Sequence, residues 1–442
     1  MKARTPGAVP PPLRAGAPAG TQDTPATGKD HRARDGHDGR EAVHDGLQDA
    51  HDGQDAEELL AAAREAVDPE LHRAIGSLPP AMRRIALHHF GWESVPLAAP
   101  DGSRAGRPPR RPGPAGEAAP PGGPRHMPRV SPLGMAPPAG APGRVAGAPA
   151  ASSPAGKAIR PALVFAAVRA LDGPTEVAAR AAAAVELVHN FTLLHDDVMD
   201  RDTTRRHRPT AWTVFGVPDA ILAGDAIQAL AYRLLAEDPH PAAPTAAARL
   251  AACVIELCEG QQADTALERR GPEGITLDES LSMAEAKTGA LIGCACALGA
   301  LYAGAGPQEV SALDAFGRQA GLAFQLIDDV IGIWGDPRRT GKPAGADLIA
   351  RKKSLPVVAA LTSGTPAAVE LADLYAAPAT HATVDLERTV QAVERAGGRD
   401  WAQTHAADRM ARAVQHLSRA VPDPAAAGEL LALAEFVTRR SA

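Results

Sequence analysis

Three carboxylates close one long apolar stretch of the sequence. The stretch ELVHNFTLLHDDVMD ends with Asp196, Asp197 and Asp200. On a helix, Asp196 and Asp200 lie one turn apart on the same face, where like charges repel and the helix dipole disfavours anions. A divalent cation removes this repulsion, and Mg²⁺ is usually held by one or two carboxylates together with substrate phosphates. The spacing therefore predicts a Mg²⁺ site for a phosphorylated ligand; the alternative is a solvated acidic helix end followed by a basic loop.

Basic side chains and a second carboxylate pair favour the metal interpretation. Arg205 and Arg206 follow the first carboxylates, and guanidinium groups can grip phosphate oxygens at two points. A second apolar stretch, AGLAFQLIDDVIGIWGD, carries Asp328 and Asp329, with Gln325 one turn before them. Two helices that bring carboxylates to the same end of a bundle would form a facing metal clamp.

Isolated cations elsewhere in the sequence extend this interpretation. Each lies in an apolar or loop setting and could instead be a surface residue that keeps its charge in water. They are Lys157, Arg160, Lys287, Lys342, Lys352 and Lys353. Together they would form a cationic ring large enough for two diphosphates.

The elements that must position these residues are predicted to be helices. From Lys157 to the C-terminus the sequence is rich in alanine and leucine, with long stretches of helical periodicity and almost no alternating β-branched runs. Residues 56–94 predict a shorter helical segment, in which Pro69 begins the second helix. We therefore expect an all-α fold built as one large helical bundle.

Two further segments have the composition of solvated chain. Residues 1–55 are polar and repeat HDG at positions 37, 44 and 51, and residues 96–154 are dominated by proline and glycine. Neither has enough large apolar residues to offset the entropy of ordering, so both are predicted to be disordered, the second as an insert within a domain of residues 56–442. The repeated histidines could bind metal, although a disordered tail is the favoured interpretation. Either segment could bind an unknown partner.

Composition disfavours several classes of protein. The chain has 442 residues and a formal net charge of -6, which is not typical of a nucleic-acid-binding protein. Its four cysteines form no CxxC pair, which disfavours a structural zinc site and suits a reducing cytoplasm. No signal peptide and no apolar run of about 18 residues is evident. We therefore expect a cytoplasmic protein that does not span a membrane.

Five motifs in order resemble those of the trans-type isoprenyl diphosphate (polyprenyl) synthases. HDDVMD with RRHRPT resembles the first aspartate-rich motif, and FQLIDDVIG resembles the second. GKAIRP resembles the GGKxxRP signature, AKTG the Lys-Thr motif, and ELVHNFTLLHDD the helix leading into the first motif. The resemblance covers about residues 56–440. It implies mostly antiparallel helices around a deep central cavity, usually a homodimer, and Mg²⁺-dependent head-to-tail condensation of an allylic diphosphate with isopentenyl diphosphate.

The resemblance also implies a role for each candidate residue. Mg²⁺, as three ions in each active site, would be bound by Asp196, Asp197, Asp200, Asp328 and Asp329. The allylic diphosphate would be held by Arg205, Lys287 and Lys342. Isopentenyl diphosphate would be held by Lys157, Arg160, His189 and Arg206. The same site would be lined by Gln325, Thr288 and Lys352. The histidine has an alternative interpretation as a residue at the edge of the core.

Three departures from the family pattern concern single positions. Gly332 stands where the second motif often has a third aspartate, which would leave one metal bound more loosely or through water. Asp336, one turn further on, could compensate. His207 replaces the glycine that usually follows the arginine pair, and AGKAIRP has one glycine fewer than usual. The first departure bears on full activity, and the other two look harmless.

The length of the product depends on residues that precede the first carboxylates. Phe191 lies five residues before Asp196, about 7.5 Å along a helix axis, and an aromatic residue there resembles family members that stop at C15 to C20 products. Thr192 is small and the first motif lacks a two-residue insertion, so geranylgeranyl diphosphate is the expected product. The alternative is that Phe191 is ordinary core.

Two other functions share parts of this pattern. A terpene cyclase has the same fold and a DDxxD motif, but it needs an Asn/Ser/Glu metal triad on a late helix and no lysine-rich isopentenyl site. A non-catalytic partner subunit of a synthase typically loses aspartates or the basic set, whereas only one aspartate is missing here. Both remain alternatives to a prenyltransferase.

Overall fold

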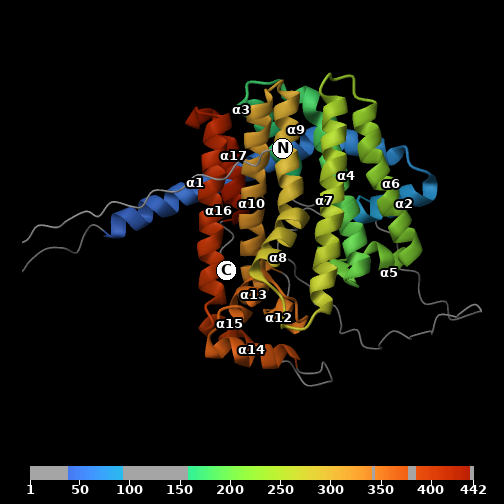
Figure 1. Cartoon of the computed structure of the whole chain (residues 1–442). Coiled ribbons are helices and arrows are strands. Elements are labelled where there is room, and N and C mark those ends of the chain that lie inside the picture. The colour runs from blue at the N-terminus through green and yellow to red at the C-terminus, as the bar shows by residue number, and fades with distance from the viewer. Residues whose placement is uncertain (1–37, 93–157, 341–343, 377–384, 439–442) are drawn as a thin grey trace, which may run out of the picture. The chain divides into compact units, whose positions relative to one another are not determined.

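A computed structural model of the chain (Figure 1) describes the backbone in four ranges, 38–92, 158–340, 344–376 and 385–438. Side chains are described from residue 56 onward, except at 339–340. The chain divides into two units, residues 1–50 and residues 51–442.

The predicted disordered segments lie largely outside the described residues. Helix α1 (Asp38–Gly76) begins inside the predicted tail of residues 1–55, so the tail's last part is helical rather than irregular. Residues 1–37 and the predicted insert at 96–154 are not described. Their disorder stays a prediction.

The described chain is helical apart from one short hairpin. The further elements in chain order are α2 (Pro80–Phe90), α3 (Ile159–Ala170), the 3₁₀ helix η1 (Thr175–Ala178), α4 (Ala179–Met199), β1 (Thr204–Arg205), β2 (Arg208–Pro209), α5 (Ala211–Phe215), α6 (Val217–Ala236), α7 (Ala243–Arg269), α8 (Leu277–Ala284), the π-helix η2 (Glu285–Gly289), α9 (Ala290–Tyr302), α10 (Pro307–Trp334), α11 (Pro337–Thr340), α12 (Ala346–Ile349), α13 (Leu355–Leu361), α14 (Pro366–Ala376), α15 (Leu386–Arg395), α16 (Gly398–Ala420) and α17 (Pro424–Thr438).

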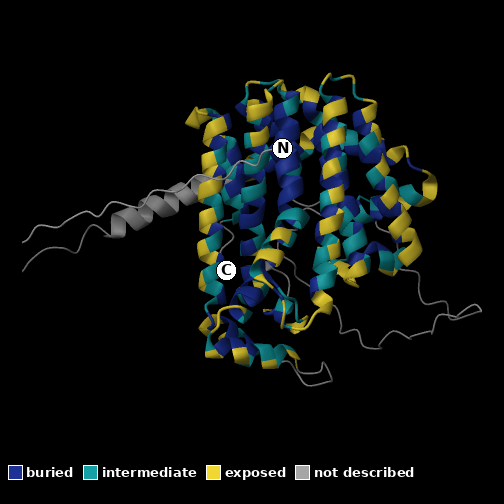
Figure 2. Ribbon diagram, viewed as in Figure 1, coloured by how far each residue is buried: buried dark blue, intermediate teal, exposed yellow. Residues whose placement is uncertain are grey.

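Long helices run side by side within residues 51–442 (Figure 1). α10 lies between α9 and α16 and makes its most extensive contacts with them, while α4 packs on α6 and α3 packs on α9. Their inner faces form a large apolar core, shown dark blue in Figure 2. The short helices α12 to α15 gather at one end, where a smaller core includes Ile333, Leu348, Val357 and Leu371. The predicted all-α fold is confirmed.

The helix break predicted at Pro69 was wrong, because α1 continues through this residue. Leu60, Val67, Leu71 and Ile75 are buried on both sides of the proline at helical spacing. An interior proline costs about 3 kcal/mol, since it removes one hydrogen bond and its ring crowds the preceding turn. Burial of this continuous apolar face outweighs that local cost.

The expectation that no segment has the length and apolar character of a membrane span was also wrong. By length and composition alone, two described segments could cross a membrane, Thr175–Met199 and Leu277–Tyr302. Their most apolar windows are 67% and 72% buried against the rest of the protein. Their burial against other helices of the bundle accounts for much of their apolar composition.

Glycines let α9 and η2 approach α10 closely. A Cβ added to Gly317 would lie 2.6 Å from the carbonyl oxygen of Ile292 and 2.7 Å from Cα of Gly293. One turn further on, a Cβ on Gly321 would lie 2.8 Å from the backbone of η2. Because Cβ atoms cannot approach backbone atoms so closely, only glycine permits this contact. As a result, Thr288 of η2 comes within hydrogen-bond distance of α10.

We expect Gly317→Ala to lower the free energy of unfolding by about 1–3 kcal/mol, because the added methyl group forces two backbones apart. Gly428→Ala is the matched control, since Gly428 lies on α17, is exposed and has nothing within 4 Å of the added Cβ. This control should raise stability by up to about 1 kcal/mol, because alanine is the better helix former. Urea denaturation of both variants measures the difference, and changes of the same sign would contradict the close contact.

Candidate active site

Two adjoining cavities bring together most of the residues predicted from the sequence. The first has a volume of about 390 Å³, and its lining includes Phe191, Thr192, Asp196, Lys287 and Thr288. The second has a volume of about 450 Å³, and its lining includes Arg205, Arg206 and Asp328. Because both are also lined by Arg160, His189 and Leu193, they are neighbouring compartments of one site.

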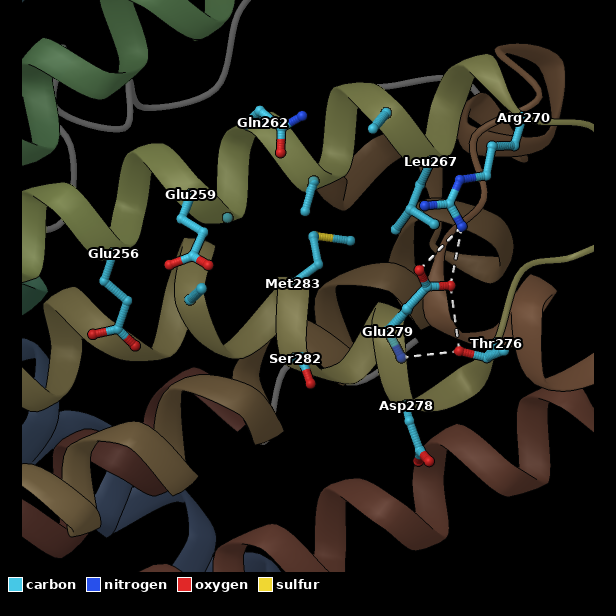
Figure 3. A pocket seen from close by; sticks show the side chains of 14 residues that line it. Glu256, Glu259, Gln262, Leu267, Arg270, Thr276, Asp278, Glu279, Ser282 and Met283 are labelled. Carbon is cyan, nitrogen blue, oxygen red and sulfur yellow. Dashed lines mark hydrogen bonds and ion pairs between the residues drawn. The ribbon is translucent and has the colours of Figure 1, made fainter.

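A larger groove lies between α7 and α8 (Figure 3). Its volume is about 660 Å³, and its lining includes the acidic residues Glu256, Glu259 and Glu279. Arg270 forms an ion pair with Glu279 at 3.1 Å, and the Glu279 backbone N–H donates to the side chain of Thr276. No residue predicted for the site lines this groove. A mainly acidic lining repels a diphosphate, so the two adjoining cavities remain the candidate site.

The first carboxylate group combines α4 with α7. Asp196 and Asp200 lie one turn apart at the end of α4, and Asp264 of α7 is close enough to influence both. The pKa of Asp196 is raised to about 6, chiefly by burial and also by the charges of Asp200 and Asp264, while Lys287 opposes the shift. Lys287 Nζ donates to Asp264 Oδ2 at 2.5 Å. Asp264 was not predicted, because a single acid within a long helix has no spacing signal.

Asp197, unlike Asp196 and Asp200, is hydrogen-bonded to Arg205. The residue is 1% exposed, and its Oδ1 accepts a hydrogen bond from Arg205 Nε at 2.7 Å. Its other oxygen, Oδ2, is buried without a hydrogen-bond partner in the described part of the chain. The structure thus uses one oxygen of Asp197 to anchor the arginine. Oδ2 is therefore the oxygen of Asp197 that has no partner among the described residues and is left for the predicted metal role.

A short hairpin directs the two arginines to different parts of the site. β1, which carries Arg205, pairs antiparallel with β2. Arg206 and His207 form the turn with φ values of 51° and 62°, the left-handed conformation that glycine adopts most easily. A histidine at position 207 in place of glycine therefore costs roughly 1 kcal/mol in backbone conformation. From the sequence we had expected this departure to have no cost. Arg205 reaches α4, and Arg206 lies close enough to interact with Glu186.

A buried acid, Glu186, balances the arginines of the second cavity. It is 8% exposed and accepts a hydrogen bond from Asn190 Nδ2 at 3.0 Å. Burial raises its pKa, while Arg160 and Arg206 oppose the shift. Burial and the same two arginines lower the pKa of His189 well below its usual value, so the imidazole is neutral near pH 7. Glu186 was not predicted, because nothing in its local sequence separates it from an ordinary helix residue.

The second carboxylate pair has one buried and one exposed member. Thr288 Oγ1 donates to Gln325 Oε1 at 2.7 Å, and Gln325 Nε2 donates to Asp329 Oδ1 at 2.8 Å. Asp329 Oδ2 accepts from the Leu355 N–H at 2.9 Å, and burial raises the pKa of Asp329 to about 6. Asp328 is exposed and lines the second cavity. Asp328 is therefore the member of the pair that can reach a ligand there.

Lys352 brings a positive charge to the second carboxylate pair. Burial lowers its pKa, but the surrounding aspartates, Asp329 foremost, raise it, and the net pKa lies above its usual value. Two other predicted cations, Lys157 and Lys342, lie outside the described residues. Their roles stay predictions.

The residues present fit a magnesium site that a substrate completes. Within the described ranges, no three side chains of His, Cys, Asp or Glu are arranged to hold an ion by themselves. Mg²⁺ does not need such a cage, because it usually keeps waters and binds one or two carboxylates together with phosphate oxygens. Carboxylates from α4, α7 and α10, with the unpartnered Oδ2 of Asp197, are the donor set that such an ion uses.

Both residues predicted to control product length line the first cavity. Phe191 is 6% exposed and packs edge-on against His195, with 5.0 Å between the ring centroids. Thr192 lies beside it and donates a hydrogen bond to the His189 carbonyl. Both precede the carboxylates along α4, and the apolar residues Leu193 and Leu257 line the same cavity.

Known proteins share both the sequence and the fold. Residues 148–393 match the polyprenyl synthetase family. The chain is 43% identical over 383 residues to a geranylgeranyl diphosphate synthase of Mycobacterium tuberculosis, covering 86% of this chain and 93% of the relative. It is 37% identical over 388 residues to a (2E,6E)-farnesyl diphosphate synthase of the same organism, covering 87% and 93%. The crystal structure of a polyprenyl synthetase from Streptomyces coelicolor superposes with a TM-score of 0.70 at 35% identity, covering 86% and 98%.

We expect Asp196→Asn to stabilise the metal-free protein at pH 8 by an amount on the order of 2 kcal/mol. The pKa of Asp196 is about 6 in the folded protein against an ordinary value of 3.8. Stability linked to this group is therefore fully present below about pH 4 and is lost as the pH rises through 6. The difference between the variant and the unaltered protein should shrink as the pH falls.

Denaturation in EDTA between pH 4 and pH 8 measures this dependence. Asp408→Asn is the matched control, because Asp408 is exposed on α16. It should change stability little at any pH. A stability difference for Asp196→Asn that does not vary with pH would contradict the raised pKa.

Proposed function

This chain belongs to the polyprenyl synthetase family, and we propose that it is a Mg²⁺-dependent prenyltransferase that condenses isopentenyl diphosphate with an allylic diphosphate. The observation that carries the proposal is the pair of adjoining cavities that share Arg160 and His189. The first cavity is lined by Asp196, Lys287 and apolar residues such as Phe191 and Leu257, and the second is lined by arginines together with Glu186 and Asp328. Two diphosphates could therefore bind side by side, with their hydrocarbon parts in contact.

The first cavity suits the allylic diphosphate. Lys287 lines this cavity and Arg205 lines the adjoining one. Both supply positive charge to the diphosphate oxygens, and each is already oriented by an aspartate. Asp196 lines this cavity, Asp200 lies one turn further along the chain and Asp328 lines the adjoining cavity, and these carboxylates would hold the Mg²⁺. The bound metal would neutralise the charge that develops on the leaving diphosphate. The apolar wall of the cavity then keeps water away from the allylic cation.

The second cavity suits isopentenyl diphosphate. Arg160 and Arg206 supply two positive charges, and the neutral His189 can donate one hydrogen bond without adding charge. The double bond of isopentenyl diphosphate attacks the allylic cation, and a new carbon–carbon bond forms. A proton then leaves to the released diphosphate, so the reaction needs no protein base.

The proposed product is short, C15 to C20, with geranylgeranyl diphosphate favoured. Phe191 lines the first cavity below the carboxylates, where an aromatic ring blocks a longer tail. Similarity to relatives that are named geranylgeranyl and farnesyl diphosphate synthases supports the same range. The ion count of three Mg²⁺ per site belongs to this proposal as well.

Neither alternative function is favoured by an observation. A terpene cyclase does not need the lysines that lie among the carboxylates here, Lys287 and Lys352. A non-catalytic subunit typically loses acidic or basic residues, yet Asp196, Arg205 and Asp328 all line the cavities.

The proposal includes a homodimer. Large apolar side chains are exposed at the end of α4 and on the neighbouring helices α6 and α7: Met199, Val217, Ile221, Leu222 and Ile255. These exposed side chains support the homodimer, because a second copy that covered them would remove apolar surface from water. A monomer in analytical ultracentrifugation would contradict this part of the proposal. The cytoplasmic location, and a partner for the tail or insert, also remain predictions.

An assay of the purified chain alone tests the proposed reaction. The protein is incubated with labelled isopentenyl diphosphate, Mg²⁺ and dimethylallyl, geranyl or farnesyl diphosphate in turn. We expect prenyl diphosphates of C15 to C20, no product in EDTA, and no product from Asp200→Ala, which lacks one carboxylate of the first group. Cyclised hydrocarbons would indicate a terpene cyclase, and no turnover with any primer would contradict the prenyltransferase.

We expect Phe191→Ala to lengthen the product by at least one isoprene unit, because the freed volume extends the cavity. Phe316→Ala is the matched control, since Phe316 is fully buried and lines neither cavity. The control should lose about 3–5 kcal/mol of stability and keep its product length. Product chromatography and a melting curve measure both variants. A Phe191→Ala variant that melts early but makes the same product would show that Phe191 is ordinary core.

A further inference from the structure

The space beside Gly332 is filled by a carboxylate from elsewhere in the chain. Gly332 lies on α10 four residues after Asp328, so a side chain at this position would lie on the same helix face. A Cβ added there would lie 2.2 Å from Asp347 Oδ2 and 2.7 Å from Asp347 Cγ. The carboxylate of Asp347 therefore occupies the space that a side chain on residue 332 would need.

Backbone contacts hold Asp347 against α10. The N–H of Gly345 donates to the carbonyl of Ile333, the residue after Gly332, at 3.1 Å. Gly345 has a φ of 69°, which turns the chain into the short helix α12. Leu348 of α12 is fully buried in the smaller core. The carboxylate thus lies beside α10 because its own helix is anchored there.

The neighbouring charges show that Asp347 belongs to the second carboxylate group. It interacts electrostatically with Asp329 and with Lys352, whose backbone N–H also donates to the Asp347 carbonyl at 2.8 Å. Asp336, which the sequence offered as a substitute, is exposed, and its Oδ1 accepts from the Arg338 N–H. Asp347 is therefore better placed than Asp336 to act with this group.

We propose that Asp347 supplies the third carboxylate of the second metal clamp, and that residue 332 is glycine because this carboxylate needs the space. The inference rests on the proposed function, since it assigns a role toward the Mg²⁺ of that reaction. The third carboxylate has moved from the helix to the segment that follows it. An aspartate at 332 would then be harmful here, because two carboxylates would compete for one position.

Moving the carboxylate back onto α10 tests the inference. The variants are Asp347→Ala, Gly332→Asp and the double variant that combines them. Mg²⁺ affinity is measured by titration in the presence of inorganic diphosphate, with the melting temperature as the readout. In a second titration Mn²⁺ replaces Mg²⁺, and electron paramagnetic resonance is the readout. Neither readout requires prenyl transfer.

We expect Asp347→Ala to weaken Mg²⁺ binding about tenfold, as loss of a group that supports a metal does. Gly332→Asp alone should lower the melting temperature and bring no gain in affinity. The double variant should recover affinity to within about threefold of the unaltered protein, because each change removes the need for the other. Asp336→Ala is the matched control and should leave affinity unchanged.

The conservative variant Asp347→Asn guards against a folding defect, because it keeps the shape and removes only the charge. Unchanged Mg²⁺ affinity in Asp347→Asn would overturn the inference, as would tighter binding in Gly332→Asp with Asp347 still present. Unaltered protein that binds Mg²⁺ and diphosphate but makes no prenyl product would overturn the proposed function and leave this inference standing.

Discussion

Negative charge concentrated at one end of the bundle is the constraint on which the rest of the structure depends. Asp196 of α4 is repelled by Asp264 of α7, and Asp329 of α10 is repelled by Asp347. Burial makes these repulsions stronger than they would be in water. Lys287 and Lys352 offset part of this repulsion. A divalent cation can neutralise the remainder, and a diphosphate can then complete the coordination of that cation.

Packing elsewhere must hold this charge in place. α9 and α10 meet backbone to backbone through glycines, and this contact brings Thr288 to Gln325 and thereby orients Asp329. The apolar core below supplies the stabilisation that the charged end lacks. The left-handed turn of the hairpin directs Arg205 to Asp197, near the end of α4, and Arg206 toward Glu186, earlier in the same helix.

The sequence by itself determined the helical class and the residues that local spacing marks. Apolar periodicity identified the helices, and paired carboxylates within one turn identified Asp196 and Asp328. Such features depend only on neighbours in the chain, and so they can be found without a structure. Local rules were misleading where packing overrode them, as at Pro69, where a continuous buried face keeps α1 intact. Inspection of the sequence also missed two stretches, Thr175–Met199 and Leu277–Tyr302, that are as long and as apolar as membrane spans.

Only the tertiary structure decided which distant side chains meet. Asp264 lies 23 residues from Lys287 in sequence, and Asp347 lies 15 residues beyond the glycine whose space it fills. Glu186 is an unremarkable helix residue until α3 and the hairpin place arginines around it. The helical repeat determines which residues share a face, but it does not determine which other helix that face will contact. Close approach through glycine and the burial of apolar faces make that choice, and they involve the whole chain at once.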